Sequence, residues 1–152
     1  MKYRGRASCL VIRDNKILMV KHKQDGIEYY CLPGGGIEKG ETPEQAAVRE
    51  LKEECLVNGT IINMTCICNL PDENKKNYTF HINIGEQEPE LGYDPEIISN
   101  PILIGVKWLS LNEICERDRA YLWAAGLASI RGFTDELDSW SDDISYPEKR
   151  GL

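Results

Sequence analysis

Apolar and polar residues alternate along several stretches of this chain, and alternation with a period of two predicts β-strands. The predicted strands cover residues 3–13, 16–23, 28–32, 60–70, 78–84 and 102–109. Asp14-Asn15 and Asp25-Gly26 are turn sequences, so the first two strands are expected to form a hairpin. The fifth strand is predicted to place four apolar side chains on one face: Tyr78, Phe80, Ile82 and Ile84.

Apolar positions three and four residues apart predict two helices. Thr42 is a suitable N-cap for the first helix, Pro43 fits its first position, and Gln45 completes a capping box. Its core side is expected to hold Ala47, Val48, Leu51 and Cys55. The second helix is predicted over 117–131, with a last helical turn at 134–140. Its packing side, for the core or for a dimer, would be Leu122, Ala125, Gly126, Ser129 and Ile130. These elements together predict an α/β or α+β domain.

Composition narrows the class of protein. The chain has 152 residues, of which 41% are hydrophobic and 28% charged, so one soluble globular domain over 1–152 is expected. The net charge of -7 argues against a nucleic-acid partner, which a basic face would bind. A small phosphorylated substrate stays compatible with this charge, because bound metal ions reverse the local field.

Cysteine usage and the absence of long apolar runs predict a cytoplasmic protein. The six cysteines include no CxxC pair, and no apolar run is long enough to span a membrane. Reduced thiols are therefore expected. Cys66 and Cys68 would share one face of a strand, where they are either small core residues, the favoured interpretation, or a soft-metal or redox pair.

Three glutamates lie close together on the first predicted helix. Glu50 and Glu54 are one turn apart, and Glu53 is beside them around the helix. Three neighbouring carboxylates repel one another and weaken an isolated helix. A hard divalent cation with oxygen ligands would remove that penalty, and Mg²⁺ is commonly bound by one or two carboxylates plus substrate phosphates.

These glutamates belong to a longer motif. Gly35 is followed after five residues by Glu41, and after seven more by the sequence Arg49-Glu50-Leu51-Lys52-Glu53-Glu54. This pattern resembles the Nudix box, and the preceding Leu32-Pro33-Gly34-Gly35-Gly36 is also typical of the Nudix family. The motif has fixed spacings and is far more specific than a lone glycine motif. The resemblance implies an α/β/α sandwich, in which a mixed β-sheet lies between the helix of the box and the C-terminal helix.

One position departs from the family pattern, which has glycine where this chain has Leu56. That glycine normally ends the helix in a left-handed turn. Asn58-Gly59 can do the same two residues later, so a shifted helix end is predicted.

The resemblance implies a Mg²⁺-dependent hydrolase, with Mn²⁺ as the other suitable ion, that cleaves a diphosphate linkage by a metal-activated water. Glu50, Glu53 and Glu54 would bind the metal, with Glu53 and Glu54 also assigned to catalysis. Arg49, the third catalytic assignment, would hold the carboxylates in position together with Glu41.

Two further features follow from the resemblance. The backbone of Gly34-Gly35-Gly36 would turn tightly and approach the diphosphate. Nudix enzymes often recruit another glutamate from beyond the box, and in some it precedes a tryptophan, where this chain has Lys107. Glu96 is the first candidate for this catalytic role and Glu90 the second, with solvated loop acids as the equal alternative.

Several residues near the motif allow two interpretations. The Lys21-His22-Lys23 cluster is either a phosphate contact or a solvated strand end, and the second is slightly favoured. Tyr29 or Tyr30 could stack on a base or pack in the core. His81 is expected on a sheet face rather than in catalysis.

Two function classes remain from sequence alone. The favoured one is an enzyme acting on a nucleoside diphosphate derivative or a nucleoside triphosphate, and the alternative is a nucleotide-binding module that cleaves nothing. The chain keeps all four box glutamates, which favours the enzyme. The particular substrate and the oligomeric state are not determined, with a homodimer as the family-based expectation.

Overall fold

The computed structural model describes residues 4–71, 74–93 and 102–130. Glu96 and the helical turn predicted over 134–140 lie outside these residues.

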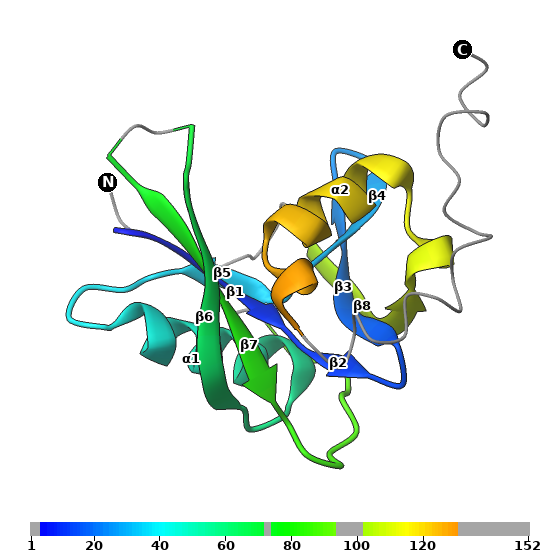
Figure 1. Cartoon of the computed structure of the whole chain (residues 1–152), viewed down its shortest axis with the longest axis horizontal. Coiled ribbons are helices and arrows are strands. Elements are labelled where there is room, and N and C mark those ends of the chain that lie inside the picture. The colour runs from blue at the N-terminus through cyan, green and yellow to red at the C-terminus, as the bar shows by residue number, and fades with distance from the viewer. Residues whose placement is uncertain (1–3, 72–73, 94–101, 131–152) are drawn as a thin grey trace.

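Within the described residues, eight strands form two four-stranded sheets (Figure 1). One sheet has the order β5 (Gly34–Gly36), β1 (Gly5–Leu10), β7 (Lys76–Asn83) and β6 (Thr60–Asn69). In the other, β3 (Lys16–Gln24) pairs with β2 (Ile12–Arg13), β4 (Ile27–Cys31) and β8 (Ile102–Ser110). Only the β1–β7 pair is parallel among the described strands, so the first sheet is mixed.

The expected single sheet is thus divided in two, and the division falls at Val11. The chain passes there from β1 in one sheet to β2 in the other. The Val11 carbonyl lies just beyond β1 and accepts a hydrogen bond from Leu18 N of β3 at 2.9 Å. The predicted hairpin of the first two strands is present as β2 and β3, with Asp14 and Asn15 in the left-handed conformation that a two-residue turn requires.

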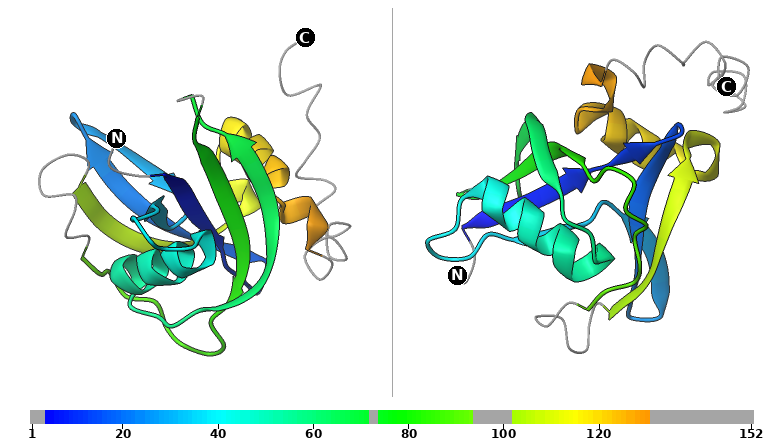
Figure 2. Two further views of the ribbon diagram at one scale, coloured as in Figure 1. Left: turned by 90° about the vertical axis from the view of Figure 1, so that its left-hand side faces the viewer. Right: turned by 90° about the horizontal axis from the view of Figure 1, so that it is seen from below.

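Two helices cover opposite faces of the strands, as Figure 1 and Figure 2 show and as the resemblance implied. Along β1, Ala7 and Cys9 enter the core cluster under α1 (Pro43–Cys55), whereas Leu10 enters the cluster under α2 (Glu116–Ala124). β3 alternates in the same way. A strand buried on both faces is an apolar run rather than a clean alternation, because each face needs its own apolar side chains.

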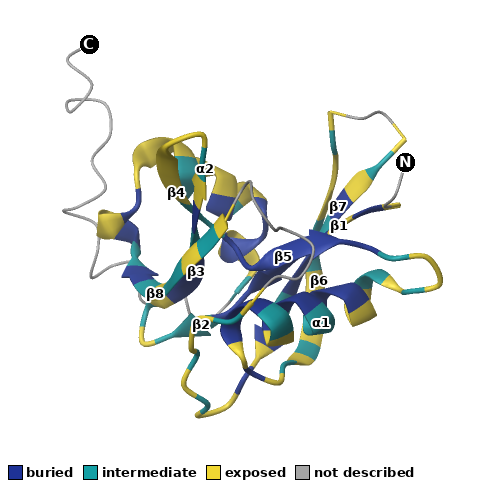
Figure 3. Cartoon of the chain, turned by 180° about the vertical axis from the view of Figure 1, so that it is seen from behind, coloured by how far each residue is buried: buried dark blue, intermediate teal, exposed yellow. Residues whose placement is uncertain are grey.

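Helix α1 begins as predicted. Thr42 Oγ1 accepts from Gln45 N at 3.1 Å, and Gln45 Oε1 accepts from Thr42 N at 2.9 Å. The predicted core side is wrong at Val48, which is only partly buried, while Ala46 is buried in its place. Figure 3 shows β5 wholly buried, and α1 striped with buried and exposed residues.

The predicted shift of the helix end is wrong. Helix α1 ends at Cys55, and Leu56 itself takes the left-handed conformation with φ 56° and ψ 36°. Its N–H donates to the Lys52 carbonyl at 3.1 Å. The chain therefore turns where the family glycine would turn it, with a side chain in a conformation that its Cβ disfavours.

The second helix is shorter than predicted and ends at Ala124. A 3₁₀ turn, η2 (Leu127–Ser129), follows after Gly126, whose φ is +124°. A Cβ at Gly126 would collide with the Thr65 side chain, and Thr65 Oγ1 donates to the Ala125 carbonyl at 2.8 Å. Close contact with β6 therefore stops the helix. Another 3₁₀ turn, η1 (Leu111–Glu113), follows β8, and the N–H and Oγ of Ser110 both donate to Glu113 Oε1, at 3.0 and 2.9 Å.

Strand β6 does not follow its predicted alternation, because its register against β7 shifts between Ile61 and Asn63 and again between Met64 and Cys66. Cys66 is partly buried and Cys68 exposed, so the favoured interpretation of both as core residues is wrong. By contrast, the apolar face predicted for the strand over 78–84 is confirmed: Phe80, Ile82 and Ile84 are buried, and Tyr78 packs against them.

No helix among the described residues is long and apolar enough to cross a membrane.

Thiol reactivity tests this burial pattern. Burial raises the pKa of Cys9 and Cys55, and it raises that of Cys31 to about 12. Only the thiolate form of a cysteine reacts with iodoacetamide. Each unit by which the pKa of a thiol is raised lowers the fraction present as thiolate about tenfold. Iodoacetamide at pH 8 is expected to label the exposed Cys68 and Cys115 more than about tenfold faster than these three. Mass spectrometry of tryptic peptides measures the rates, and equal rates in the folded protein would contradict the packing.

The left-handed Leu56 gives a second prediction. Its side chain is 49% exposed, so Leu56→Gly loses little apolar burial while it relieves the Cβ clash. Leu56→Gly is expected to raise the free energy of unfolding by about 1 kcal/mol. Leu56→Ala keeps the Cβ and is the control, with no gain expected. Urea unfolding measures both, and a gain of the same size in the alanine variant would rule out backbone strain.

Candidate active site

The glycines before α1 form a strand rather than the tight turn that was predicted. Gly34, Gly35 and Gly36 are all buried in β5, which pairs antiparallel with β1. A Cβ at Gly34 would overlap the β1 backbone, and a Cβ at Gly35 would overlap the Glu50 carboxylate. Glycine is required at Gly34 and Gly35, because β5 lies tightly between β1 and the Glu50 carboxylate of α1.

Two of the predicted metal ligands are nearly inaccessible. Glu50 is 2% and Glu54 1% exposed, on the side of α1 that faces the strands. Glu54 Oε1 accepts from Gly34 N at 2.9 Å. Glu53 lies closer to the surface, with 26% of its side chain exposed. Buried carboxylates need compensating partners, because the desolvation penalty for each is several kcal/mol.

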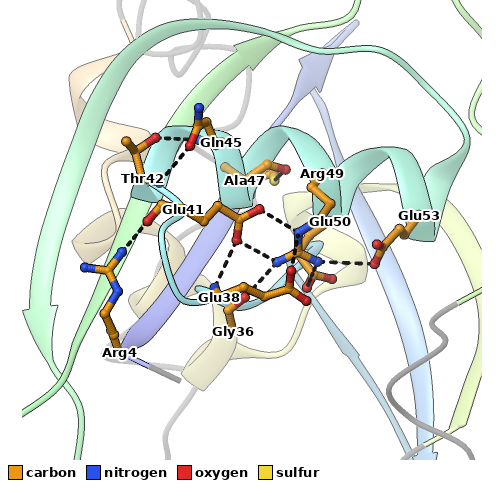
Figure 4. A network of polar contacts seen from close by, with 11 residues as sticks. Arg4, Gly36, Glu38, Glu41, Thr42, Gln45, Ala47, Arg49, Glu50 and Glu53 are labelled. Atoms are coloured by element: carbon orange, nitrogen blue, oxygen red, sulfur yellow. Dashed lines mark hydrogen bonds and ion pairs between the residues drawn. The ribbon is translucent and has the colours of Figure 1, made fainter. Parts of the chain in front are cut away.

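Arg49 supplies much of that compensation (Figure 4). Its guanidinium donates to both oxygens of Glu41, at 2.7 and 3.0 Å, which is a bidentate pair. Arg49 Nη1 also donates to Glu50 Oε1 at 2.9 Å and Glu53 Oε2 at 3.4 Å, and Nη2 donates to the Gly36 carbonyl at 2.9 Å. The hydrogen bonds from Arg49 lower the pKa of Glu41, so this carboxylate stays ionised. The structure thus brings together the box residues that the resemblance assigned to one site.

Sequence reasoning missed the position of His22 beside the glutamates, because it treated His22 only as part of the Lys21-His22-Lys23 cluster. The side chain is buried on β3, with Nε2 3.8 Å from Glu54 Oε2 and Nδ1 3.3 Å from Cys31 Sγ. Its ring also stacks on Tyr29, with 5.7 Å between centroids. The signal was the Asp25-Gly26 turn, because a two-residue hairpin fixes the register and sets His22 opposite Tyr29.

The favoured interpretation of the basic cluster as a solvated strand end is therefore wrong for His22. Lys21 is a partly exposed residue whose Nζ lies 2.7 Å from Glu28 Oε1 and 5.5 Å from the centre of the Tyr30 ring. Lys23 is exposed.

The loop after β7 is bonded to the end of α1. Backbone N–H groups of Glu90, Gly92 and Tyr93 donate to the carbonyls of Cys55, Glu54 and Glu53, at 2.8 to 2.9 Å. Glu90 is exposed, and its carboxylate makes no contact that assigns it a role. The loop satisfies the helix carbonyls that lack intrahelical partners and holds this end of α1 in place.

The donor set suits a hard cation. Glu50, Glu53 and Glu54 offer carboxylate oxygens, which Mg²⁺ and Mn²⁺ prefer, and the bare backbone at Gly35 leaves space for the Glu50 carboxylate. In the part of the chain that the structure describes, no three acidic, histidine or cysteine side chains already form a metal cluster. Arg49 provides the positive charge in this arrangement.

The fold and this site define an α/β protein whose candidate metal ligands all lie on helix α1, behind a strand of glycines and a short loop. The family model for the NUDIX domain matches residues 2–129. The chain belongs to the Nudix family.

Curated relatives match over part of their length. An ADP-ribose pyrophosphatase of Methanocaldococcus jannaschii is 35% identical over 74 residues, which are 48% of this chain and 44% of that protein. Human diphosphoinositol polyphosphate phosphohydrolase 2 is 31% identical over 87 residues, 55% of this chain and 48% of that protein. The chain thus spans about half the length of these relatives.

Solved structures show the same fold. A MutT NUDIX hydrolase from Burkholderia pseudomallei superposes with a TM-score of 0.64 and 20% identity, over 82% of this chain and 98% of that chain. A NUDIX hydrolase from Nitrosomonas europaea gives a TM-score of 0.60 and 19% identity, over 96% of this chain and 98% of that chain.

The contact between Gly35 and Glu50 can be tested by stability. Gly35→Ala is expected to lower the free energy of unfolding by about 1–3 kcal/mol, because the methyl group displaces the Glu50 carboxylate from its place beside Arg49. Gly105→Ala on β8 is the control, since a Cβ there would make only ordinary contact with Lys21. Denaturant unfolding measures both variants, and an unchanged midpoint for Gly35→Ala would show that the packing is looser than described.

Proposed function

We propose that this chain is a divalent-metal-dependent hydrolase that cleaves a diphosphate linkage in a nucleoside diphosphate derivative or a nucleoside triphosphate. The observation that carries the proposal is the buried pair of carboxylates, Glu50 and Glu54, held on α1 against β5. A fold gains nothing from two neighbouring buried carboxylates unless cations compensate them. Arg49 is one such cation, and carboxylate oxygens are also the ligands that suit a hard metal ion.

Mg²⁺ is the proposed ion and Mn²⁺ the alternative, with Glu50, Glu53 and Glu54 as the residues that would hold it. When bound, such an ion lowers the pKa of a water and offsets negative charge that develops on phosphate oxygens. The residues of the chain orient the ligands. The Gly34 N–H fixes one oxygen of Glu54, and Arg49 fixes Glu50 and Glu53 relative to Glu41. This preorganisation confines the carboxylates before any substrate arrives.

A further glutamate from beyond the box is proposed to complete the site. Glu96 or Glu90 would be the base or a further ligand, and the loop that carries Glu90 is anchored to the end of α1 by its backbone. Because its backbone is bonded to α1, this loop holds Glu90 close to the end of that helix.

The names of the relatives favour a diphosphate-type linkage as the bond that this chain would cleave. One is a pyrophosphatase named for ADP-ribose, a second is named for diphosphoinositol polyphosphate, and a third, from Sphingopyxis alaskensis, is an RNA pyrophosphohydrolase. The net charge of -7 favours a small substrate over RNA.

Release of phosphate and pyrophosphate from a panel of nucleotides, with and without Mg²⁺, tests the function. Hydrolysis is expected only with the metal, and Glu54→Gln is expected to lower kcat by about 100-fold or more. The substitution removes one charge at nearly constant shape. Glu44→Gln is the matched control, because Glu44 is an exposed residue in the first turn of the same helix.

The alternative function predicts a different result. Arg49 pairs with Glu50 and Glu53, so the site would also be a stable part of a binding module. If the folded protein cleaves nothing, yet binds a nucleotide equally well with either residue at position 54, the hydrolase proposal fails and the binding module takes its place.

A further inference from the structure

One face of the β3–β4 hairpin places a histidine and a cysteine beside the box helix. His22 follows Val20 by two residues on β3, so their side chains lie on one face, and the register of β4 sets Cys31 opposite Val20. Val20 belongs to the core cluster under α1, and Cys31 packs against that cluster. Cys31 and His22 are therefore diagonal neighbours on the face of the hairpin that is turned toward α1.

Two contacts join these side chains into a series that ends at Glu54. Cys31 Sγ lies 3.3 Å from His22 Nδ1, and His22 Nε2 lies 3.8 Å from Glu54 Oε2. His22 is 6% and Glu54 1% exposed, so the second contact is shielded from bulk water. The other oxygen, Glu54 Oε1, accepts from Gly34 N at 2.9 Å. The two oxygens of this carboxylate thus face different elements, Oε1 toward β5 and Oε2 toward β3.

The thiol decides which ring nitrogen of His22 carries a proton. Burial and the negative charge of Glu54 raise the pKa of Cys31 to about 12, so the sulfur keeps its hydrogen at neutral pH. An S–H group at 3.3 Å donates to a ring nitrogen that has a free lone pair, which makes Nδ1 the acceptor. In a neutral imidazole the proton is then on Nε2, because the hydrogen bond made by one nitrogen sets the state of the other. A carboxylate facing Nε2 favours the same state, since it accepts and cannot donate.

We propose that Cys31 and His22 are positioning residues that hold the Glu54 carboxylate for the metal ion, with the thiol donating to Nδ1 and the Nε2–H facing Glu54 Oε2. This inference rests on the proposed function, in which Glu54 is a metal ligand. A carboxylate bonded through one oxygen can still rotate about its last side-chain bond, whereas a second donor confines the plane of the group. Partners that orient a metal ligand in this way typically account for about 10- to 100-fold in metal affinity.

The ring nitrogens of His22 report this arrangement without any metal or substrate. The chain has two histidines, so nitrogen NMR of the folded, metal-free protein distinguishes His22 from His81, with His81→Gln assigning the signals. At pH 8 the spectrum is expected to show Nε2 protonated and Nδ1 accepting a hydrogen bond. Cys31→Ser keeps a donor and should preserve the Nδ1 signal, whereas Cys31→Ala should move it. A proton on Nδ1, or an Nδ1 signal that does not change in Cys31→Ala, overturns the inference.

Binding of Mn²⁺ alone tests the consequence for the site. His22→Gln keeps an N–H donor on its side chain, whereas His22→Leu removes the donor. His22→Leu is expected to raise the Kd for Mn²⁺ about tenfold or more, and His22→Gln to recover most of that loss. His81→Leu is the control, because His81 lies on β7 in the other sheet, and it should leave the Kd unchanged. Electron paramagnetic resonance of free Mn²⁺ measures each Kd, and equal values for the leucine and glutamine variants overturn the positioning role.

Failure of the inference and failure of the proposed function give different results. If hydrolysis needs Mg²⁺ and is lost in Glu54→Gln, but both His22 variants bind Mn²⁺ as tightly as the unsubstituted protein, the positioning role is overturned and the hydrolase stands. If the unsubstituted protein binds no Mn²⁺ and cleaves nothing, both are overturned. If His22→Leu does not fold, the cysteine variants decide: a Kd that rises in Cys31→Ala but not in Cys31→Ser supports the inference, and equal Kd values overturn it.

Discussion

The buried carboxylates of Glu50 and Glu54 are the constraint on which the rest of this structure depends. Charges in a protein interior are tolerated only with partners at close range. Here the partners come from four elements: Arg49 on α1 itself, Gly34 on β5, His22 on β3, and the loop before α1, whose Glu41 orients Arg49. Packing α1 in this position therefore gives both buried carboxylates partners at close range.

The strands are arranged to make that position available. β1 and β3 are buried on both faces, so they separate the core under α1 from the core under α2. The glycine strand β5 fits between β1 and α1, where a Cβ at Gly34 would overlap the β1 backbone and a Cβ at Gly35 would overlap the Glu50 carboxylate.

Local signals in the sequence predicted the elements whose physics is local. A capping box involves four residues, and Thr42 with Gln45 therefore marked the start of α1 correctly. The Asp25-Gly26 turn determined the β3–β4 register within a few residues. The predictions failed where distant groups decide the outcome. Val48 has the apolar character of a core residue, but packing placed Ala46 inward instead. The bulges in β6 depend on its pairing with β7, which periodicity within one strand does not contain.

The sequence by itself determined the spacing of the box residues, the helix that carries them and the family to which they belong, because these follow from chemistry between residues a few positions apart. Only the tertiary structure decided that the glycines form a strand, that Leu56 keeps the left-handed turn of the missing glycine, and that His22 lies beside Glu54. The physical reason is that burial and close packing are set by the whole core. Thirty-two positions separate His22 from Glu54, and no rule of local spacing joins them.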